Sequence, residues 1–361
     1  MSLSIGIVGL PNVGKSTLFN ALTSNNILAA NYPFATIEPN TGIVPVPDER
    51  LAKLAEMYST QKVIPATVTF VDIAGIVKGA SEGEGLGNQF LSHIREVDAI
   101  CHVVRAFESG DVVHVENAIH PKNDIDVINT ELILADLQTI DKRLPRLEKE
   151  SRINPKLKPS HSTLADIKEL LDSGEPLNSV PKLLEEYSEN LSDLHLLTAK
   201  PVIYLFNIDE ADLENKSKLE ELSKLVAPSR SLFVNAQFEA ELNALDTDER
   251  AEMLEMAGVE KSGLEQVIQS AYEILGLQSY LTAGPKEVRA WTIHKGATAP
   301  QAAGVIHGDF ERGFIAAEVV SYQDLVSAGS KTAAKAIGKV RTEGKTYLMQ
   351  SDDVVEFRFN V

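Results

Sequence analysis

The chain begins with a short apolar run that leads directly into a glycine-rich loop. Residues 4–8 have the sequence SIGIV, and residues 9–17 have the sequence GLPNVGKST, which matches the spacing G-x-x-x-x-G-K-[ST]. Glycine is needed there because its backbone adopts conformations, and permits close approaches, that a Cβ atom would forbid. Leu18, Phe19 and Leu22 give the next segment one apolar helical face. This strand, loop and helix constrain the fold to an α/β sheet whose loop wraps the phosphates of a nucleotide.

The loop assigns roles to individual residues. Lys15 would reach the β- and γ-phosphates and neutralise charge during phosphoryl transfer, and the Ser16 hydroxyl would bind Mg²⁺. The N-terminus of the following helix adds a partial positive charge at the phosphates. The residues predicted to bind the nucleotide here are Asn12, Val13, Gly14, Lys15, Ser16 and Thr17.

A second motif follows at residues 67–75, where the β-branched strand TVTFV ends in D-x-x-G. Asp72 is placed to hold Mg²⁺ through water, and the Gly75 N–H is placed to sense a γ-phosphate. Between the two motifs, a loop threonine would close on the metal when a triphosphate is bound. Thr36 is the candidate for this metal ligand, and Thr41 is the competing choice.

Strand-like and helix-like segments alternate in residues 1–128, and strand character returns at residues 202–206 and 231–234. This pattern predicts a doubly wound, mainly parallel sheet in a nucleotide-binding domain of residues 1–128 and 200–277. Residues 129–199 instead carry apolar residues at helical spacing, around 133–147 and again around 184–197, which indicates an inserted helical hairpin of coiled-coil type. Pro145 is expected to end or kink the first helix, unless it starts a new one.

Residues 278–361 are predicted to form a small α+β domain, with β-like pieces around a helix rich in Lys and Ala. This segment has a net charge of about +1 in a chain of net charge −18, so any nucleic-acid contact is expected there. Lys331, Lys335 and Lys339 would line one helical face suited to phosphates, and Arg341 and Lys345 extend the patch. The alternative is an ordinary solvated helix.

No apolar stretch reaches the length of a membrane span, and the N-terminus has no signal-peptide pattern, so no membrane contact is predicted. The single cysteine, Cys101, lies in an apolar run and is interpreted as a packing residue. These features predict a cytoplasmic protein. The sequence does not determine its oligomeric state.

The combination of GLPNVGKST, NYPFATIEPNTG and DIAGIVKGASEGEGLGNQFLSHI resembles the Obg-like class of P-loop proteins, in its YchF (Obg-like ATPase) branch. The resemblance covers essentially the whole chain, and residues from about Tyr280 resemble a TGS domain, a β-grasp module associated with RNA contacts. It implies ATP in preference to GTP as the substrate, with Phe107, Asn207 and Ile208 near the base. From the sequence alone Phe107 is equally well a core aromatic. Ala236 belongs to residues 235–237, which would form the last base-contacting loop along the chain.

The residues themselves also indicate a change of base. Most relatives select guanine with N-K-x-D, whose Asp accepts hydrogen bonds from N1–H and the exocyclic amine, whereas residues 207–210 here are N-I-D-E. The unprotonated N1 of adenine would present a lone pair to a carboxylate, so the altered motif should remove the guanine preference. The only other candidate motif, residues 215–218, has Lys where the Asp belongs and is rejected.

Hydrolysis is expected to be slow. Many P-loop GTPases place Gln directly after D-x-x-G to orient the attacking water, and this chain has Ile76 there. His93 and His114 are the candidates to position water, and the resemblance favours His114. The resemblance also raises the question of a stimulating K⁺ ion near Asn12, which the sequence does not decide.

Two functions remain open at this point. In the first, the protein is a nucleotide-controlled switch whose slow ATPase gates binding to the ribosome or RNA. In the second, it is a freestanding ATPase or GTPase that acts on a protein client without RNA contact. The lack of any further catalytic motif favours the switch.

Overall fold

The computed structural model describes residues 3–23, 40–73, 86–107, 120–256 and 258–360. Their contacts divide the chain into two compact units. The first unit holds Met1–Val44 with Thr69–Val267, and the second holds Pro45–Val68 with Ile268–Val361. Among the helices in the described ranges, none combines the length and the apolar character that a bilayer crossing requires.

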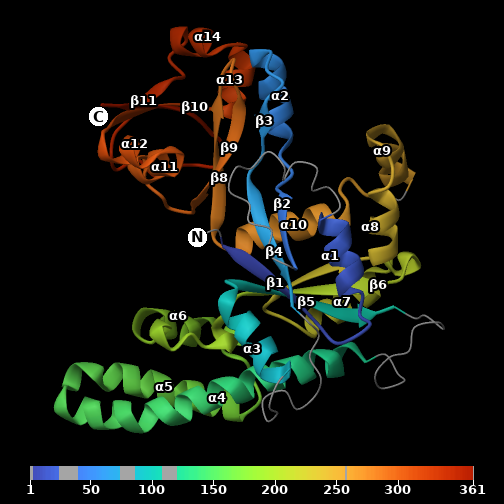
Figure 1. Ribbon diagram of the computed structural model, residues 1–361, viewed down its shortest axis with the longest axis vertical. Helices are drawn as coiled ribbons and strands as arrows, with labels where there is room; N and C mark the ends of the chain where they lie inside the picture. The colour runs from blue at the N-terminus through green and yellow to red at the C-terminus, as the bar shows by residue number, and fades with distance from the viewer. Residues whose placement is uncertain (1–2, 24–39, 74–85, 108–119, 257, 361) are drawn as a thin grey trace. The chain divides into compact units, whose positions relative to one another are not determined.

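The first sheet runs in the order β2-β4-β1-β5-β6-β7 (Figure 1). Its strands are β1 (Ser4–Val8), β2 (Thr41–Pro45), β4 (Thr67–Asp72), β5 (Ala99–Ala106), β6 (Val202–Ile208) and β7 (Arg230–Val234). The pairs β1–β4, β1–β5, β5–β6 and β6–β7 are parallel. Every residue of β5 and β6 is buried, as expected for central parallel strands covered on both faces. Cys101 lies in this core, 1% exposed, which confirms its packing role.

The inserted helices form a hairpin that extends away from this sheet, and two of them lie side by side (Figure 1). They are α4 (Pro121–Ile153) and α5 (Lys158–Asp172), with the shorter α6 (Pro181–Asn190) packed on α5. A single apolar core joins them, including Ile140, Leu147, Ile167 and Tyr187. The other helices of this unit are α1 (Lys15–Thr23), α3 (Leu86–Glu96), α7 (Lys216–Lys224), α8 (Ala236–Leu242) and α9 (Thr247–Met256).

Two details of the hairpin differ from the sequence prediction. Helix α4 continues through Pro145 to Ile153, because packing on α5 outweighs the one backbone hydrogen bond that proline cannot make. The second helix of the hairpin is α5, whereas the predicted second stretch around residues 184–197 lies on α6 and the short 3₁₀ turns after it.

The second unit contains a sheet of order β11-β10-β12-β8-β9-β3. Its strands are β3 (Val63–Ile64), β8 (Leu277–Ala283), β9 (Val288–His294), β10 (Phe314–Ser321), β11 (Arg341–Glu343) and β12 (Asp353–Phe359). Its helices are α2 (Glu49–Tyr58), α11 (Ala299–Ile306), α12 (Gly308–Arg312), α13 (Tyr322–Ala328) and α14 (Lys331–Ala336), and α10 (Gly263–Ile274) crosses the division between the units.

Residues 45–68 correct the predicted domain organisation. The sequence places them in the nucleotide-binding domain, whereas their contacts place them with the C-terminal segment. Val63 and Ile64 pair with β9, and α2 packs on β8, β9 and α13. The other boundaries, including that of the inserted hairpin, stay predictions.

Candidate nucleotide-binding site

A cavity of about 570 Å³ opens at the carboxyl ends of the parallel strands of the first sheet. This edge is the usual ligand position in open α/β sheets. The loop after β1, the residue after β5, the end of β6 and the loop after β7 all contribute to its wall. The lining residues are Asn12, Gly14, Lys15, Ser16, Thr17, Phe107, Asn207, Ile208, Asp209, Asn235, Ala236 and Gln237.

The glycines of the loop are required by close approaches. A Cβ atom on Gly9 would lie 2.5 Å from the carbonyl oxygen of Val103, and one on Gly14 would lie 2.5 Å from Nδ2 of Asn207. Gly14 also has φ +99°, and Asn12 adopts φ 62° in the same loop. The loop therefore fits closely over the sheet and opens onto the cavity immediately before α1 begins at Lys15.

Lys15 is held inside the loop by two backbone carbonyl groups. Its ammonium donates hydrogen bonds to the carbonyl oxygens of Gly9 at 3.0 Å and Leu10 at 2.8 Å. Burial lowers the pKa of Lys15, and the nearby carboxylate of Asp72 opposes that shift. A bound triphosphate would offer the ammonium stronger, charged acceptors than these two carbonyls.

Asp72 ends β4 as predicted, and one of its carboxylate oxygens is buried without a hydrogen-bond partner among the described residues. Burial raises the pKa of Asp72, and Lys15 opposes the shift. Its Oδ1 is buried and finds no hydrogen-bond partner among the described residues. Buried polar atoms normally have partners, and a hydrated Mg²⁺ held by Asp72 and the Ser16 hydroxyl would supply one here. The two oxygens therefore fit the predicted metal, which when bound would neutralise charge on the transferred phosphoryl group.

Asn207 connects the two sides of the cavity. Its Nδ2 donates to the carbonyl of Val13 at 3.1 Å, and its Oδ1 accepts from the backbone N–H of Ala236 at 3.0 Å. The side chain is only 5% exposed. Val13 is itself buried and is not a lining residue, so its part in the site is this carbonyl. One amide thus sets the spacing between the phosphate loop and the loop after β7.

Phe107 lies on the cavity wall and is only partly buried, so it is not a core aromatic. The buried guanidinium of Arg105 lies 4.4 Å from its ring centroid, and Arg105 Nε donates to the Phe107 carbonyl at 3.4 Å. These contacts fix the ring position. Contact with the base stays a prediction.

Asn235 and Gln237, from the predicted base-contacting loop at residues 235–237, line the cavity, and so does Asp209, for which the sequence predicted no role. Asn235 donates to the Ile208 carbonyl at 2.9 Å and accepts from Phe238 N at 2.8 Å, which caps α8. An Asn just before a helix is a common N-cap, and that signal was available in the sequence.

Four predicted residues lie outside the described residues: Thr36, Gly75, Ile76 and His114. Their roles stay predictions. The competing residues are described, with Thr41 at the start of β2 and His93 exposed on α3. Neither lines the cavity.

His102 of β5 is a buried histidine close enough to Lys15 for the two charges to interact. Burial, together with the nearby charge of Lys15, lowers its pKa to about 3. Its ring lies 5.3 Å from that of Tyr204, and its Nε2 has no hydrogen-bond partner in the described ranges. The imidazole is therefore neutral in the folded protein at neutral pH.

This histidine predicts a pH dependence of stability. Below about pH 6.5 the unfolded chain binds a proton at His102 that the folded chain excludes, so stability falls toward pH 3 by up to about 1.4 kcal/mol per pH unit. We expect His102→Phe, which keeps the ring packing, to flatten urea-unfolding free energies between about pH 6 and pH 4. Parallel curves for the two proteins would show that His102 titrates normally in the fold.

The lysines of the predicted nucleic-acid patch do not lie on one helical face, contrary to the prediction from the sequence. Helix α14 ends at Ala336, where Gly338 with φ +72° closes it, so Lys339 lies beyond the helix and the three lysines do not share one helical face. Lys331 pairs with Glu318 and Glu356, Lys335 pairs with Glu318, and Lys339 pairs with Asp324 at 3.0 Å. The hydrogen bond from Lys331 is the main cause that lowers the pKa of Glu318 to about 2.

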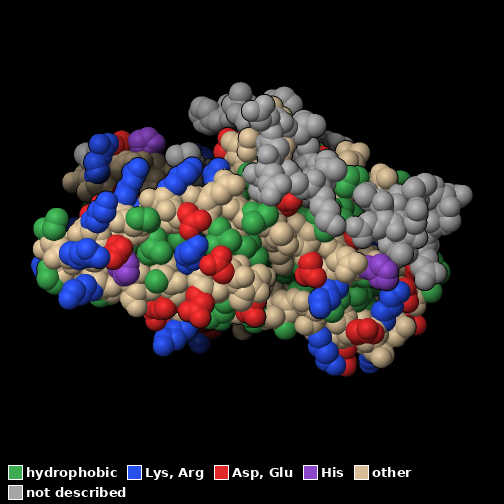
Figure 2. Space-filling model, turned by 90° about the horizontal axis from the view of Figure 1, so that it is seen from below, with side chains coloured by type: hydrophobic (Ala, Val, Ile, Leu, Met, Phe, Trp, Pro, Cys, Tyr) green, Lys and Arg blue, Asp and Glu red, His purple; other side chains and the backbone are tan. Residues whose placement is uncertain are grey.

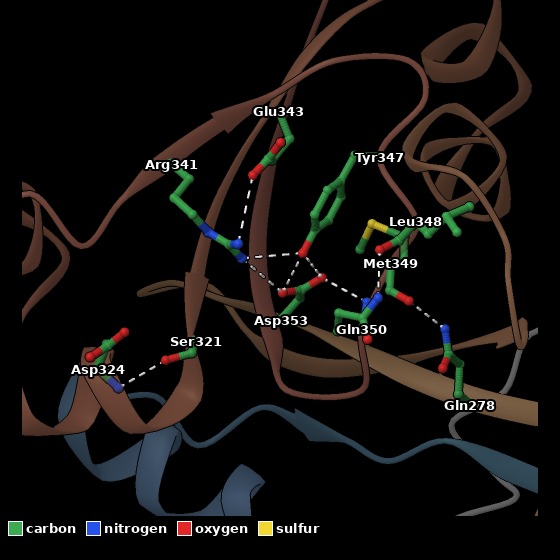
Figure 3. Close-up of polar contacts among 10 residues, drawn as sticks. All are labelled: Gln278, Ser321, Asp324, Arg341, Glu343, Tyr347, Leu348, Met349, Gln350 and Asp353. Carbon is green, nitrogen blue, oxygen red and sulfur yellow. Dashed lines mark hydrogen bonds and ion pairs between the residues drawn. The ribbon is translucent and has the colours of Figure 1, made fainter.

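Arg341 is also engaged within its own unit (Figure 3). Its guanidinium lies 3.7 Å from both Glu343 and Asp353 and donates to the Tyr347 hydroxyl at 3.2 Å. Tyr347 in turn donates to Asp353. Lys345 is exposed. Most of this charge is thus balanced by carboxylates, and RNA contact at these residues stays a prediction.

Relatives match the chain over its whole length. A ribosome-binding ATPase YchF from Bacillus subtilis is 50% identical over 367 residues, covering 100% of both proteins. The protein of the same name from Escherichia coli O157:H7 is 49% identical over 364 residues, with the same coverage. The chain belongs to the YchF family. The predicted P-loop fold, with its helical insertion and YchF C-terminal domain, is confirmed.

Two family models and the solved structures agree with this membership. Residues 4–144 match a family described as 50S ribosome-binding GTPase, and residues 277–360 match the C-terminal domain of YchF GTPases, described as a protein of unknown function. The YchF GTPase of Schizosaccharomyces pombe is 40% identical with a TM-score of 0.86, covering 99% of this chain and 98% of that one. A GTP binding protein from Pyrococcus horikoshii, at 18% identity and a TM-score of 0.58, shares the fold. Relatives in the YchF family are therefore named as ATPases in some organisms and as a GTPase in another.

Proposed function

We propose that this YchF-family protein is a nucleotide-dependent switch, which binds and slowly hydrolyses ATP in preference to GTP and associates with the ribosome. The observation that carries the proposal is Lys15 on the cavity wall with Asp72 close enough for their charges to interact, while Asp72 Oδ1 has no hydrogen-bond partner among the described residues. This arrangement is suited to a metal-bound triphosphate and to the transfer of its terminal phosphoryl group.

Adenine preference is supported at the end of β6. Ile208 is fully buried at the cavity wall where the guanine-selective motif has Lys. Glu210, at the position of the guanine-reading Asp, is exposed and does not line the cavity. The described cavity therefore lacks the carboxylate that would pair with both guanine donors at this position.

Slow turnover is supported by the residue types available. The loop amides, Lys15 and the bound metal would stabilise charge on the phosphoryl group, whereas the apolar Ile76 follows D-x-x-G and cannot orient water. His114 remains the proposed water-positioning residue, and a K⁺ ion near Asn12 remains a proposed activator.

Titration of the purified protein with ATP and GTP tests the base preference. We expect the Kd for ATP to be lower than that for GTP by about tenfold or more, because mismatched hydrogen-bonding groups discriminate strongly. Displacement of a fluorescent nucleotide by each competitor, at one Mg²⁺ concentration, measures both constants. Tighter binding of GTP would refute the argument from residues 207–210.

Ribosome association is proposed because close relatives across the full chain carry that name. A ribosome-associated protein would act in the cytoplasm, which is the location we propose for it. The alternative, an ATPase that acts on a protein client without RNA, predicts no sedimentation with ribosomes in any nucleotide state.

A further inference from the structure

The turn between α4 and α5 concentrates positive charge in an acidic chain. Residues 142–158 hold seven Lys or Arg against two Glu, whereas the whole chain has a net charge of −18. Figure 2 views the hairpin from below and shows Lys and Arg side chains gathered toward its left end. We call residues 142–158 the basic tip.

Most cations of the basic tip are not balanced by carboxylates. Arg143 pairs with Glu150 at 2.9 Å, and Arg152 pairs with Glu148 at 2.6 Å. In the described parts of the chain, the remaining five have no ion-pair partner, namely Lys142, Arg146, Lys149, Lys156 and Lys158. This contrasts with Lys331, Lys335, Lys339 and Arg341, each of which has a carboxylate within 4 Å.

Three of these cations form a stripe on α4. Lys142, Arg146 and Lys149 are spaced by four and three residues, so they lie on one helical face. All three are exposed. The core face of the same helix carries Ile140 and Leu147, which at about 100° per residue lie roughly 150° around the helix from the centre of the stripe and therefore on the opposite side. Lys156 and Lys158 extend the charge around the turn into α5.

The hairpin holds this stripe on a rigid support. Its apolar core continues along the helices from Ile133 to Leu147. At its base, the buried carboxylate of Asp136 accepts hydrogen bonds from Leu197 N, Thr198 N and the Thr198 hydroxyl, each at 2.7–2.8 Å. These bonds tie α4 to the segment that enters β6. The cations are therefore presented at fixed spacing, which lowers the entropy cost of binding a partner.

We propose that the basic tip binds the phosphate backbone of ribosomal RNA. This inference rests on the proposed ribosome association and places an RNA contact on the hairpin. Unpaired cations gain from phosphate neutralisation because counterions are released from the RNA, whereas cations already paired with carboxylates must first break those pairs. The net acidity of the rest of the chain would confine contact with RNA to such local sites.

The triple variant Lys142→Gln, Arg146→Gln and Lys149→Gln tests the proposal, since Gln keeps helix propensity and the side chains are exposed. The matched control removes the same charge at three exposed lysines elsewhere, as Lys216→Gln, Lys224→Gln and Lys261→Gln. Filter binding to deproteinised 23S ribosomal RNA, between about 50 and 200 mM salt, measures affinity and its salt dependence. Sedimentation with purified 70S ribosomes is measured on the same proteins.

We expect the tip variant to bind RNA about tenfold or more weakly, with a salt slope reduced by about two to three, and the control to bind as wild type does. Equal RNA binding by tip variant and wild type would overturn the proposal. So would a tip-dependent loss of ribosome binding without any effect on bare RNA, which would indicate a ribosomal protein as the partner. Failure of the wild type to sediment with ribosomes would contradict the proposed function instead, even if the tip still bound RNA.

Discussion

Replacing Lys15 by alanine is expected to lower the rate of ATP hydrolysis by about 10²- to 10³-fold. The ammonium is buried in the loop and held by two carbonyls, so it is preorganised where charge develops on the phosphoryl group. No other described cation lines the cavity to take its place. Phosphate release under single-turnover conditions with saturating ATP measures the chemical step directly.

The control for Lys15→Ala is Lys53→Ala. Lys53 is exposed on α2 and pairs with Glu56 on the surface, so its loss should leave both stability and hydrolysis unchanged. Thermal unfolding of both variants separates a local defect from misfolding. Hydrolysis within about threefold of wild type in folded Lys15→Ala protein would contradict the assigned role.

Gly14→Ala is the second change for which we expect a large effect. The added methyl group would lie 2.5 Å from Asn207 Nδ2, and residue 14 would keep a left-handed φ of +99°. Asn207 cannot move freely because it is buried and joins Val13 to Ala236. We expect a stability loss of about 1–3 kcal/mol and a rise in the Kd for ATP of about 10²-fold, measured by calorimetric titration.

Gly174 offers a matched control for that substitution. It has a similar φ of +88°, but no atom of the described residues lies within 4 Å of an added Cβ. Gly174→Ala should therefore show the backbone cost of about 1 kcal/mol without any effect on nucleotide binding. If Gly14→Ala behaved like Gly174→Ala in both measurements, the close contact with Asn207 would not matter to the site.

The central strands were predictable from the sequence because their pattern is local. Continuous apolar runs identified β1, β6 and β7 to within about two residues. Strand β3 was not predictable, because Val63 and Ile64 form a strand only through pairing with β9, more than two hundred residues later. Helix α5 was missed although Leu164, Ile167 and Leu171 carry a helical period.

In the candidate site, too, residues in local motifs were predictable from the sequence, whereas contacts between distant segments were not. Residues of the phosphate loop and Asp72 are identified by short motifs, and the structure brings Lys15 and Asp72 close enough for their charges to interact. The bridging role of Asn207 depends on three separate segments and has no local signal. A helical pattern around Lys331 likewise contains no information about Glu318, which belongs to β10 and neutralises part of that charge.

The basic tip was missed in the sequence because charge was compared over long segments. Comparison of the C-terminal segment with all preceding residues hides seven cations within residues 142–158, because acidic residues elsewhere outnumber them. A shorter window over the turn between α4 and α5 would have found the tip. Only the structure shows that five of these cations have no carboxylate partner among the described residues.

The central claim is that the nucleotide in the cavity controls association with the ribosome. Its most direct test is the Kd of the purified protein for 70S ribosomes, measured by co-sedimentation with a non-hydrolysable ATP analogue, with ADP and without nucleotide. We predict that the Kd differs by about fivefold or more between the ATP analogue and ADP, and that Gly14→Ala abolishes the difference. Equal affinity in all three states, or no binding in any of them, would contradict the claim.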